Sequence, residues 1–302
     1  MLCAAIDIGS NTTRILVAEP ADGQLKKVME QRAYTRIGQA RLADGTIPEE
    51  KIEEVAEVVE TQAHLAREVG AEYFRAVATA ALRDAPNGKE AAAAIEDAAG
   101  VPINVVTEQE EGRLSFLGAT KALGHPTEGR VAVVDVGGGS TEIIVGTVDG
   151  GVEQVRSWPI GSGQLAEELI ESDPPSASEI RRVRDRIDEV FAEVKITRPE
   201  HAVAVGGSAT SLRKIVGARL EYETLERSIR VLSGDDAAEV GRQFELDPVR
   251  VRMLPTGVMI LEKVSELLGR ELQIGKGGIR EGIVLDMLNG GIDVSEFALT
   301  PG

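Results

Sequence analysis

Cysteine, histidine and aromatic residues are all scarce in this chain, and each scarcity excludes a class of protein. Cys3 is the only cysteine, so an intrachain disulfide cannot form, which favours a reducing compartment and a cytoplasmic protein. The three histidines, His64, His125 and His201, lack the spacing of a zinc site. Aromatic residues make up 3% of the chain, so binding by stacking on bases or sugars is not expected.

Positive charge and long apolar runs are scarce as well. The 33 basic residues are outnumbered by 50 acidic ones, and the net charge is −17, which argues against a nucleic-acid binder or a protein of acidic membrane surfaces. A polyanionic substrate would need a local basic cleft. No apolar run approaches membrane-spanning length, and the first ten residues lack the basic start of a signal peptide. The 302 residues suffice for two globular domains.

The stretch VVDVGGGSTEIIVG, residues 133–146, carries the strongest signal for a binding site. Two β-branched runs flank a glycine-rich turn, a pattern that predicts a β-hairpin. Three successive glycines let the backbone approach a ligand and turn its N–H groups toward phosphate oxygens. Asp135 ends the first run and Glu142 follows the loop. Their carboxylates are suited to hold Mg²⁺, or another divalent cation, against those phosphates.

The same pattern occurs again at residues 5–18, AIDIGSNTTRILVA. In this copy Asp7 takes the place of Asp135 and Gly9 that of Gly137, while Arg14 stands in place of Glu142. Two distant copies indicate two related domains and not a solenoid. We therefore predict two phosphate-binding hairpins that face each other across a cleft.

Apolar strand-like runs alternate with helical periodicity along the rest of the chain, which predicts an α/β fold. We place the domain boundary at residues 124–126, which gives domains 1–124 and 125–302. Further predicted strands span 28–37, 73–79, 103–106, 152–159, 201–205 and 272–274. Predicted helices span 49–69, 89–99, 108–123, 255–268 and 278–288, with others starting near 164, 176 and 233.

Three further places bear on chemistry, and each also has a purely structural interpretation. Arg83 ends a predicted strand at a loop and is suited to bidentate phosphate contact, or is a solvated arginine. The residues 206–208, Gly-Gly-Ser, open a helix where backbone N–H groups could bind an anion, or they form a plain cap. Glu111 could activate water, whereas Glu108 and Glu110 are interpreted as favourable charges at the helix dipole.

Six motifs in this order resemble the exopolyphosphatase/guanosine pentaphosphatase (Ppx/GppA) family: DIGSNTTR, an arginine after ATAAL, TEQEEGRLSF, DVGGGSTE, VGGSAT and GGIREG. The resemblance covers nearly the whole chain. It implies two actin-like, ribonuclease-H-like domains around a cleft, with the last helix packed back on the first domain. It further implies metal-dependent removal of the terminal phosphate from linear inorganic polyphosphate or from pppGpp, and it allows a homodimer.

The resemblance also implies a role for each matching residue. Glu111 resembles the family's catalytic glutamate, and Asp135 and Glu142 resemble its magnesium-site carboxylates. The matches to its phosphate-binding residues are Asp7, Gly9, Ser10, Asn11, Thr12, Arg83, Gly137, Gly138, Gly139, Ser140, Thr141, Gly207 and Ser208. The chain ends soon after GGIREG, so the added C-terminal domains of long members are absent from this sequence.

Three alternatives stay open. A pppGpp 5′-phosphohydrolase would use the same chemistry on another substrate. A nucleotide-gated binding or regulatory protein of the actin/Hsp70 type would not need Glu111 together with the two metal-site carboxylates. A sugar kinase would need a site for the phosphate acceptor and is ranked lowest.

Overall fold

The computed structural model describes residues 1–21, 24–123 and 127–290. The chain forms two compact units, and each is described by itself. Unit 1 combines Met1–Gly124 with Gly277–Gly302, and unit 2 is His125–Lys276. The predicted boundary at residues 124–126 lies outside the described residues.

Unit 1 is built on a five-stranded sheet in the order β3-β2-β1-β4-β5. Its strands are β1 (Cys3–Ile8), β2 (Thr13–Ala21), β3 (Gln24–Ala33), β4 (Tyr73–Ala78) and β5 (Ile103–Val105). β1, β2 and β3 form an antiparallel meander, whereas β4 and β5 run parallel to β1. The carboxyl ends of β1, β4 and β5 therefore lie at the same edge of the sheet.

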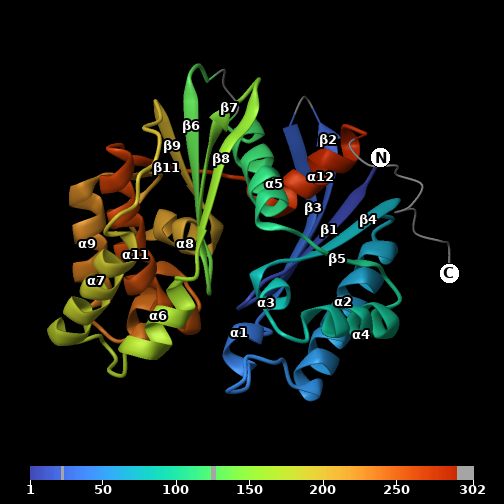
Figure 1. Ribbon diagram of the computed structural model, residues 1–302, viewed down its shortest axis with the longest axis horizontal. Helices are drawn as coiled ribbons and strands as arrows, with labels where there is room; N and C mark the ends of the chain where they lie inside the picture. Colours follow the sequence, from blue (N-terminus) through green and yellow to red (C-terminus); the bar gives the residue numbers. More distant parts are fainter. Residues whose placement is uncertain (22–23, 124–126, 291–302) are drawn as a thin grey trace. The chain divides into compact units, whose positions relative to one another are not determined.

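Helices cover both faces of this sheet (Figure 1). They are α1 (Ile37–Ala40), α2 (Glu49–Glu68), α3 (Ala80–Arg83), α4 (Gly88–Ala99), α5 (Glu108–Lys121) and α12 (Ile279–Leu288). Successive residues of β1 point to opposite faces: Ile6 and Ile8 pack in the core under α2 and α4. Cys3 and Ala5 instead pack in a smaller core with residues of α5 and α12.

The backbones of α5 and α12 are in direct contact. A Cβ added to Gly118 would lie 2.0 Å from the carbonyl oxygen of Gly278, and one on Gly282 would lie 1.9 Å from that of Leu114. Asp286 of α12 also accepts hydrogen bonds from Arg75 on β4 and Arg113 on α5, at 2.9 and 2.8 Å. The start of α5 is thus fixed by a helix from the far end of the chain.

Unit 2 has a six-stranded sheet in the order β10-β11-β9-β6-β7-β8. Its strands are β6 (Arg130–Val136), β7 (Thr141–Thr147), β8 (Gly151–Trp158), β9 (His201–Val205), β10 (Arg219–Leu220) and β11 (Leu272–Ile274). As in unit 1, an antiparallel meander is followed by a parallel strand beside its first member. The two hairpins also share one turn, because Gly9 N–H donates to the Thr12 carbonyl and Gly137 N–H to that of Ser140, both at 3.0 Å. The predicted repeat is confirmed.

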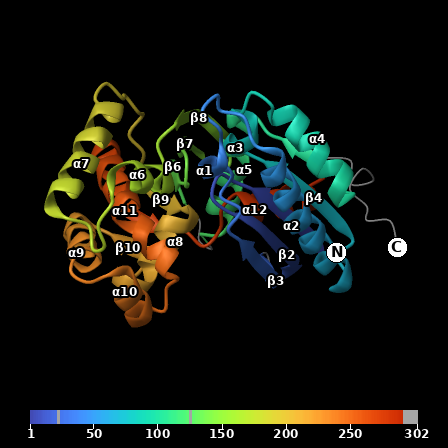
Figure 2. The ribbon, with the colours of Figure 1, turned by 90° about the horizontal axis from the view of Figure 1, so that it is seen from below.

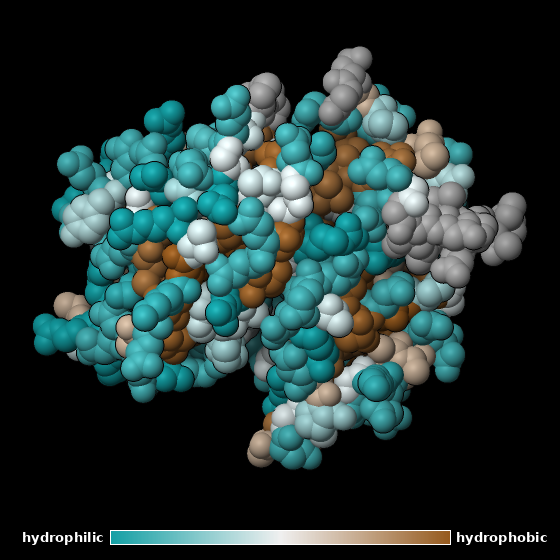
Figure 3. All heavy atoms as spheres, turned by 45° about the horizontal axis from the view of Figure 1, so that its top comes forward, coloured by the Kyte–Doolittle hydropathy of each residue, from teal (hydrophilic) through white to brown (hydrophobic). Residues whose placement is uncertain are grey.

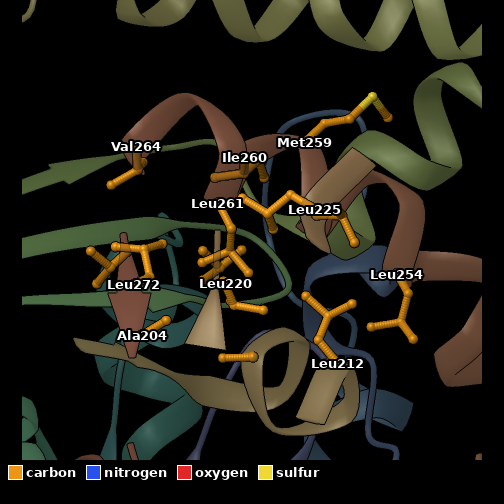
Figure 4. Packing of buried hydrophobic residues seen from close by; sticks show 14 of the residues in the cluster. Ala204, Leu212, Leu220, Leu225, Leu254, Met259, Ile260, Leu261, Val264 and Leu272 are labelled. Atoms are coloured by element: carbon orange, nitrogen blue, oxygen red, sulfur yellow. The ribbon is translucent and has the colours of Figure 1, made fainter. Parts of the chain in front are cut away.

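One long helix, α11 (Pro248–Leu268), organises the core of unit 2. Figure 2 shows it among the other helices of the unit, which are α6 (Ser162–Leu169), α7 (Ala177–Phe191), α8 (Gly206–Val216), α9 (Tyr222–Leu232) and α10 (Ala237–Phe244). Leu254, Ile260 and Leu261 of α11 are fully buried. They pack with residues of α8, α9 and β11 in the cluster drawn in Figure 4.

Three predicted boundaries are wrong. The strand predicted at 28–37 ends at Ala33, because Arg36 adopts a left-handed backbone (φ 50°) and the chain enters α1. The helix predicted from Pro255 begins at Pro248, where Asp247 caps it, and Pro255 lies inside. Burial of this turn of α11 outweighs the roughly 3 kcal/mol that an interior proline costs. Arg83 lies on the short helix α3 and not at the end of a strand.

Hydrophilic residues occupy most of the outermost positions on the face drawn in Figure 3. Among the described residues, no helix is both long and apolar enough to cross a membrane.

Candidate active site

The predicted site residues of unit 1 follow the carboxyl ends of its three parallel strands. Thr79 N–H donates to the Ile8 carbonyl at 3.2 Å, and Val106 N–H donates to the Ala78 carbonyl at 3.0 Å, so these ends are adjacent. The loop 9–12 follows β1, α3 follows β4, and α5 follows β5. Ligand sites of parallel α/β sheets lie at this edge.

The loop of residues 9–12, which the sequence predicts to bind phosphate and which we call the first phosphate loop, is anchored through its carbonyl groups. Arg36 N–H donates to the Asn11 carbonyl at 3.1 Å, and Gly38 N–H donates to the Ser10 carbonyl at 2.8 Å. Arg36 needs its left-handed backbone to reach this position. Thr12 is buried, and its hydroxyl accepts a hydrogen bond from Arg14 Nε at 3.0 Å. The loop is therefore held in one conformation by the segment that follows β3.

Arg14 lies directly opposite Asp7 in the β1–β2 ladder. Burial raises the pKa of Asp7, an effect larger than the lowering by the charges of Arg14 and Arg280. A cation opposite an acid is a favourable cross-strand pair. The first hairpin thus carries a positive charge, that of Arg14, directly opposite its acidic residue Asp7.

Glu111 and Arg83, two residues predicted separately, form an ion pair. Arg83 Nη1 donates to Glu111 Oε2 at 2.5 Å, and Arg83 Nε donates to Asp84 Oδ1 at 3.1 Å. The side chains of Arg83 and Glu111 are only 15% and 12% exposed. Burial lowers the pKa of Arg83, but the hydrogen bond and charge of Glu111 more than offset it, with help from Asp84, so the pKa is raised.

Glu110, interpreted above only as a charge at the helix dipole, has specific partners. Arg113 donates to both of its carboxylate oxygens, at 2.8 and 2.9 Å, and Arg75 lies 3.6 Å away. The hydrogen bond from Arg113 lowers the pKa of Glu110, and burial only partly opposes it. With the Thr107 hydroxyl accepting from Glu110 N–H, these contacts orient the first turn of α5. Neighbouring Glu111 is positioned by that turn.

In unit 2, Asp135 and Glu142 are directly opposite each other in the β6–β7 ladder. Like charges in this arrangement destabilise a sheet, and a bound cation removes the repulsion. Ser157 Oγ donates to Glu142 Oε1 at 3.0 Å and orients that carboxylate. No group of three or more potential metal ligands occurs in the described part of the chain. Two carboxylates suit Mg²⁺, which usually keeps several waters and substrate phosphates as its other ligands.

The loop of residues 137–140, which the sequence predicts to bind phosphate and which we call the second phosphate loop, is held by a segment that the sequence did not single out. Ser162 donates to the Gly137 carbonyl through its N–H at 2.9 Å and its hydroxyl at 3.0 Å. Gln164 N–H donates to the Gly138 carbonyl at 2.8 Å. The Thr141 hydroxyl donates to the Ile160 carbonyl at 2.6 Å. The only sequence signal for this support was the Gly-Ser-Gly run at 161–163.

The residues 206–208 form the first turn of α8, and Gly206 lies beside Asp135. Gly206 (φ 83°) lies so close that an added Cβ would be 2.3 Å from Asp135 Oδ1. Buried Arg250 lies behind the next residue, because a Cβ on Gly207 would be 2.7 Å from its Nη2. The start of α8 thus combines unpaired helix N–H groups with a nearby cation, which favours an anion. No motif in the sequence pointed to Arg250.

Ser208, predicted to bind phosphate, is oriented toward α11. Its hydroxyl would be 2.5 Å from a Cβ on Gly257, and among the described residues it has no hydrogen-bond partner. Its backbone N–H, at the start of α8, is the group available to an anion.

Gly161→Ala is expected to disable the second phosphate loop. The added Cβ would lie 2.4 Å from the backbone carbon of Gly138 and the nitrogen of Gly139, so the loop must move. Phosphate-releasing activity, measured beside a thermal unfolding curve, should fall at least about tenfold, as expected for displaced binding groups. Gly151→Ala is a control for alanine at another unit 2 glycine, since its Cβ meets nothing within 4 Å, although its φ of 78° adds strain. Full activity of Gly161→Ala would contradict the assignment of this loop.

Known proteins resemble the chain over almost its full length. Exopolyphosphatase 2 of Mycobacterium tuberculosis is 30% identical over 308 residues, which cover 94% of this chain and 96% of that protein. Exopolyphosphatase 1 of the same organism is 28% identical over 311 residues, with coverage of 97% and 90%. The crystal structure of the Aquifex aeolicus Ppx/GppA family member has a TM-score of 0.81 at 29% identity and covers 97% of this chain and 99% of that one.

Two further findings concern fold and family. An exopolyphosphatase structure from Cytophaga hutchinsonii, 19% identical, has a TM-score of 0.82 over 97% of this chain and 99% of that one and supports the fold alone. The predicted α/β fold with two actin-like domains is confirmed by these structures. The sequence model of the Ppx/GppA phosphatase family matches residues 16–290. The chain belongs to the Ppx/GppA phosphatase family.

Proposed function

We propose that this protein is an exopolyphosphatase that hydrolyses the terminal phosphate of linear inorganic polyphosphate with the help of a divalent cation. Family membership supports phosphoanhydride hydrolysis. Two relatives that are 28–30% identical over nearly their whole length are exopolyphosphatases, which supports polyphosphate as the substrate.

The observation that carries the proposal is the opposite chemistry of two hairpins with the same turn. Arg14 faces Asp7 in the first hairpin, and Glu142 faces Asp135 in the second. The first hairpin therefore presents an arginine that can attract phosphate oxygens. The second presents a pair of carboxylates that can bind a cation. Phosphate oxygens suit the first kind of group, and a metal ion that accompanies phosphate suits the second.

Asp135 and Glu142 would hold the cation, and we propose Mg²⁺. Their cross-strand pairing and the hydrogen bond that orients Glu142 fit such a role. When bound, the ion would neutralise charge on the phosphate oxygens and so favour attack at phosphorus.

The chain's own residues would perform the remaining tasks. Backbone N–H groups of the phosphate loops and the guanidinium of Arg83 would fix the terminal phosphate. Glu111 would take a proton from water as the water oxygen forms a bond to the terminal phosphorus. The bond from that phosphorus to the bridging oxygen breaks, and the shortened chain leaves with the electron pair. Positioning and electrostatics would lower the barrier.

A phosphate-release assay tests the proposal with short polyphosphate, long polyphosphate, pppGpp and ATP as substrates. Each is measured with Mg²⁺ and with a chelator. We expect release from polyphosphate with Mg²⁺ and loss of release when the chelator is present. Faster release from pppGpp than from every polyphosphate would instead assign the guanosine pentaphosphate activity. Binding without release from any substrate would favour a nucleotide-gated binding protein and overturn the proposal.

A further inference from the structure

We propose that the Arg83–Glu111 ion pair is a resting state that substrate phosphate opens, so that Glu111 is free to accept a proton from water only when a phosphate holds Arg83. The inference rests on the proposed function and concerns the same site. Besides contacting phosphate, Arg83 would then control the ability of Glu111 to accept a proton.

The guanidinium of Arg83 already has several partners. It donates to Glu111 and Asp84, and its Nη1 also lies 3.5 Å from the carbonyl oxygen of Val106. Because the side chain is only 15% exposed, water replaces these contacts poorly. A phosphate group, which accepts two parallel hydrogen bonds from arginine, is a strong competitor for it.

A carboxylate paired with arginine is a weak base. The cation stabilises the ionised form and so opposes transfer of a proton to it. A water molecule beside the resting pair is therefore not activated, and the site stays idle without substrate. When the terminal phosphate takes hydrogen bonds from Arg83, the positive charge is shared with phosphate oxygens. Glu111 then accepts the proton of the attacking water, and the bridging P–O bond breaks as described above.

Other charged side chains near Glu111 are engaged with partners of their own. Arg83 is therefore a cation for which phosphate and Glu111 can compete. Glu110 and Arg113 on the same helix hold each other, and Arg75 and Asp286 complete that group. On α12, buried Glu281 pairs with Lys27. The charged groups near the start of α5 and on the elements that pack against it include Arg75, Arg83, Asp84, Glu108, Glu110, Arg113, Arg280, Glu281 and Asp286. Arg83 is paired directly with the Glu111 carboxylate, so exchange of this partner would change the basicity of Glu111.

Rates of polyphosphate hydrolysis measured across pH provide the first test. The acid limb of kcat/KM reports the free enzyme, whereas the acid limb of kcat reports the enzyme–substrate complex. In Arg83→Met we expect the kcat/KM limb to move to higher pH by about one to two units, because Glu111 loses its cation. The acid limb of kcat should stay near its wild-type position, because in the enzyme–substrate complex the bound phosphate has already drawn Arg83 away from Glu111. Arg83→Lys keeps the charge and should keep most of the wild-type limb.

The control is Arg67→Met, which removes the same charge from the exposed last turn of α2. Protonation of the substrate affects the pH profiles of all variants equally, so differences between these profiles arise from the enzyme. Equal shifts of both limbs in Arg83→Met, or no shift in either, would overturn the inference. If the wild type releases no phosphate, the proposed function fails instead, so the two failures are distinguishable.

A binding measurement covers the case in which Arg83→Met is too slow for a pH profile. Tripolyphosphate is titrated calorimetrically, with chelator present, into wild type, Glu111→Gln, Arg83→Met and the double variant. Glu111→Gln should bind several-fold more tightly than wild type, because phosphate no longer competes with a carboxylate for Arg83. In the Arg83→Met background this gain should be largely lost. A gain of the same size in both backgrounds would show only a general charge effect and would overturn the inference.

Discussion

Glu111→Gln is expected to reduce phosphate release from polyphosphate by about 10²–10⁴-fold, the usual contribution of a general base. The amide keeps the size of the side chain but cannot take a proton from water. Because Arg83 remains available to phosphate oxygens, binding of polyphosphate should persist or strengthen. Steady-state rates together with tripolyphosphate binding measure the two effects separately.

Glu108→Gln is the matched control for this prediction. Glu108 lies on the same first turn of α5, is exposed, and loses the same charge on substitution. Its activity should stay within about twofold of wild type, because a solvated charge contributes little. Undiminished turnover by Glu111→Gln would show that another group activates the water, and the role of Glu111 would be withdrawn.

Asp135→Asn is expected to cause a second large loss, of about 10²–10³-fold at a fixed Mg²⁺ concentration. The amide removes one of the two charges that face each other across the β6–β7 ladder, so the cation is held less tightly. Titration of Mg²⁺ at saturating substrate should show a raised metal requirement. Glu142→Gln should raise that requirement too, with partial recovery at high Mg²⁺.

The matched control is Asp149→Asn, an exposed acid in the turn between β7 and β8. It should leave the metal titration curve unchanged. If Asp135→Asn lowered the rate but kept the wild-type dependence on Mg²⁺, the carboxylate would not be a metal ligand.

Features that depend on neighbouring residues could be predicted from the sequence. Each hairpin closes over four residues, and its glycine, its turn and its two strands lie together in the chain. The same locality placed Glu111 in the first turn of a helix that follows a strand. The repeat then fixed which positions of the two hairpins correspond, so the exchange of Arg14 for Glu142 was visible without coordinates.

Contacts between distant parts of the chain could not be predicted. The pairing of Arg83 with Glu111 joins two helices, α3 and α5, that local patterns describe separately. Asp286 lies 211 residues from Arg75, and neither residue shows in sequence that it has a partner. Arg250 lies behind Gly207 only because α11 crosses the start of α8. Helix α11 itself passes through Pro255, since tertiary burial overrides local propensity.

The return of α12 to unit 1 has a consequence for how the protein is made. One face of the first sheet is completed by Ile283, Val284 and Met287, which are synthesised only after the whole of unit 2. Unit 2 is continuous in sequence and can fold as soon as it has emerged. At roughly 5–20 residues per second, the strands of unit 1 wait on the order of ten seconds for their final helix. During that interval the apolar face lined by Cys3, Ala5 and Leu16 is incompletely covered.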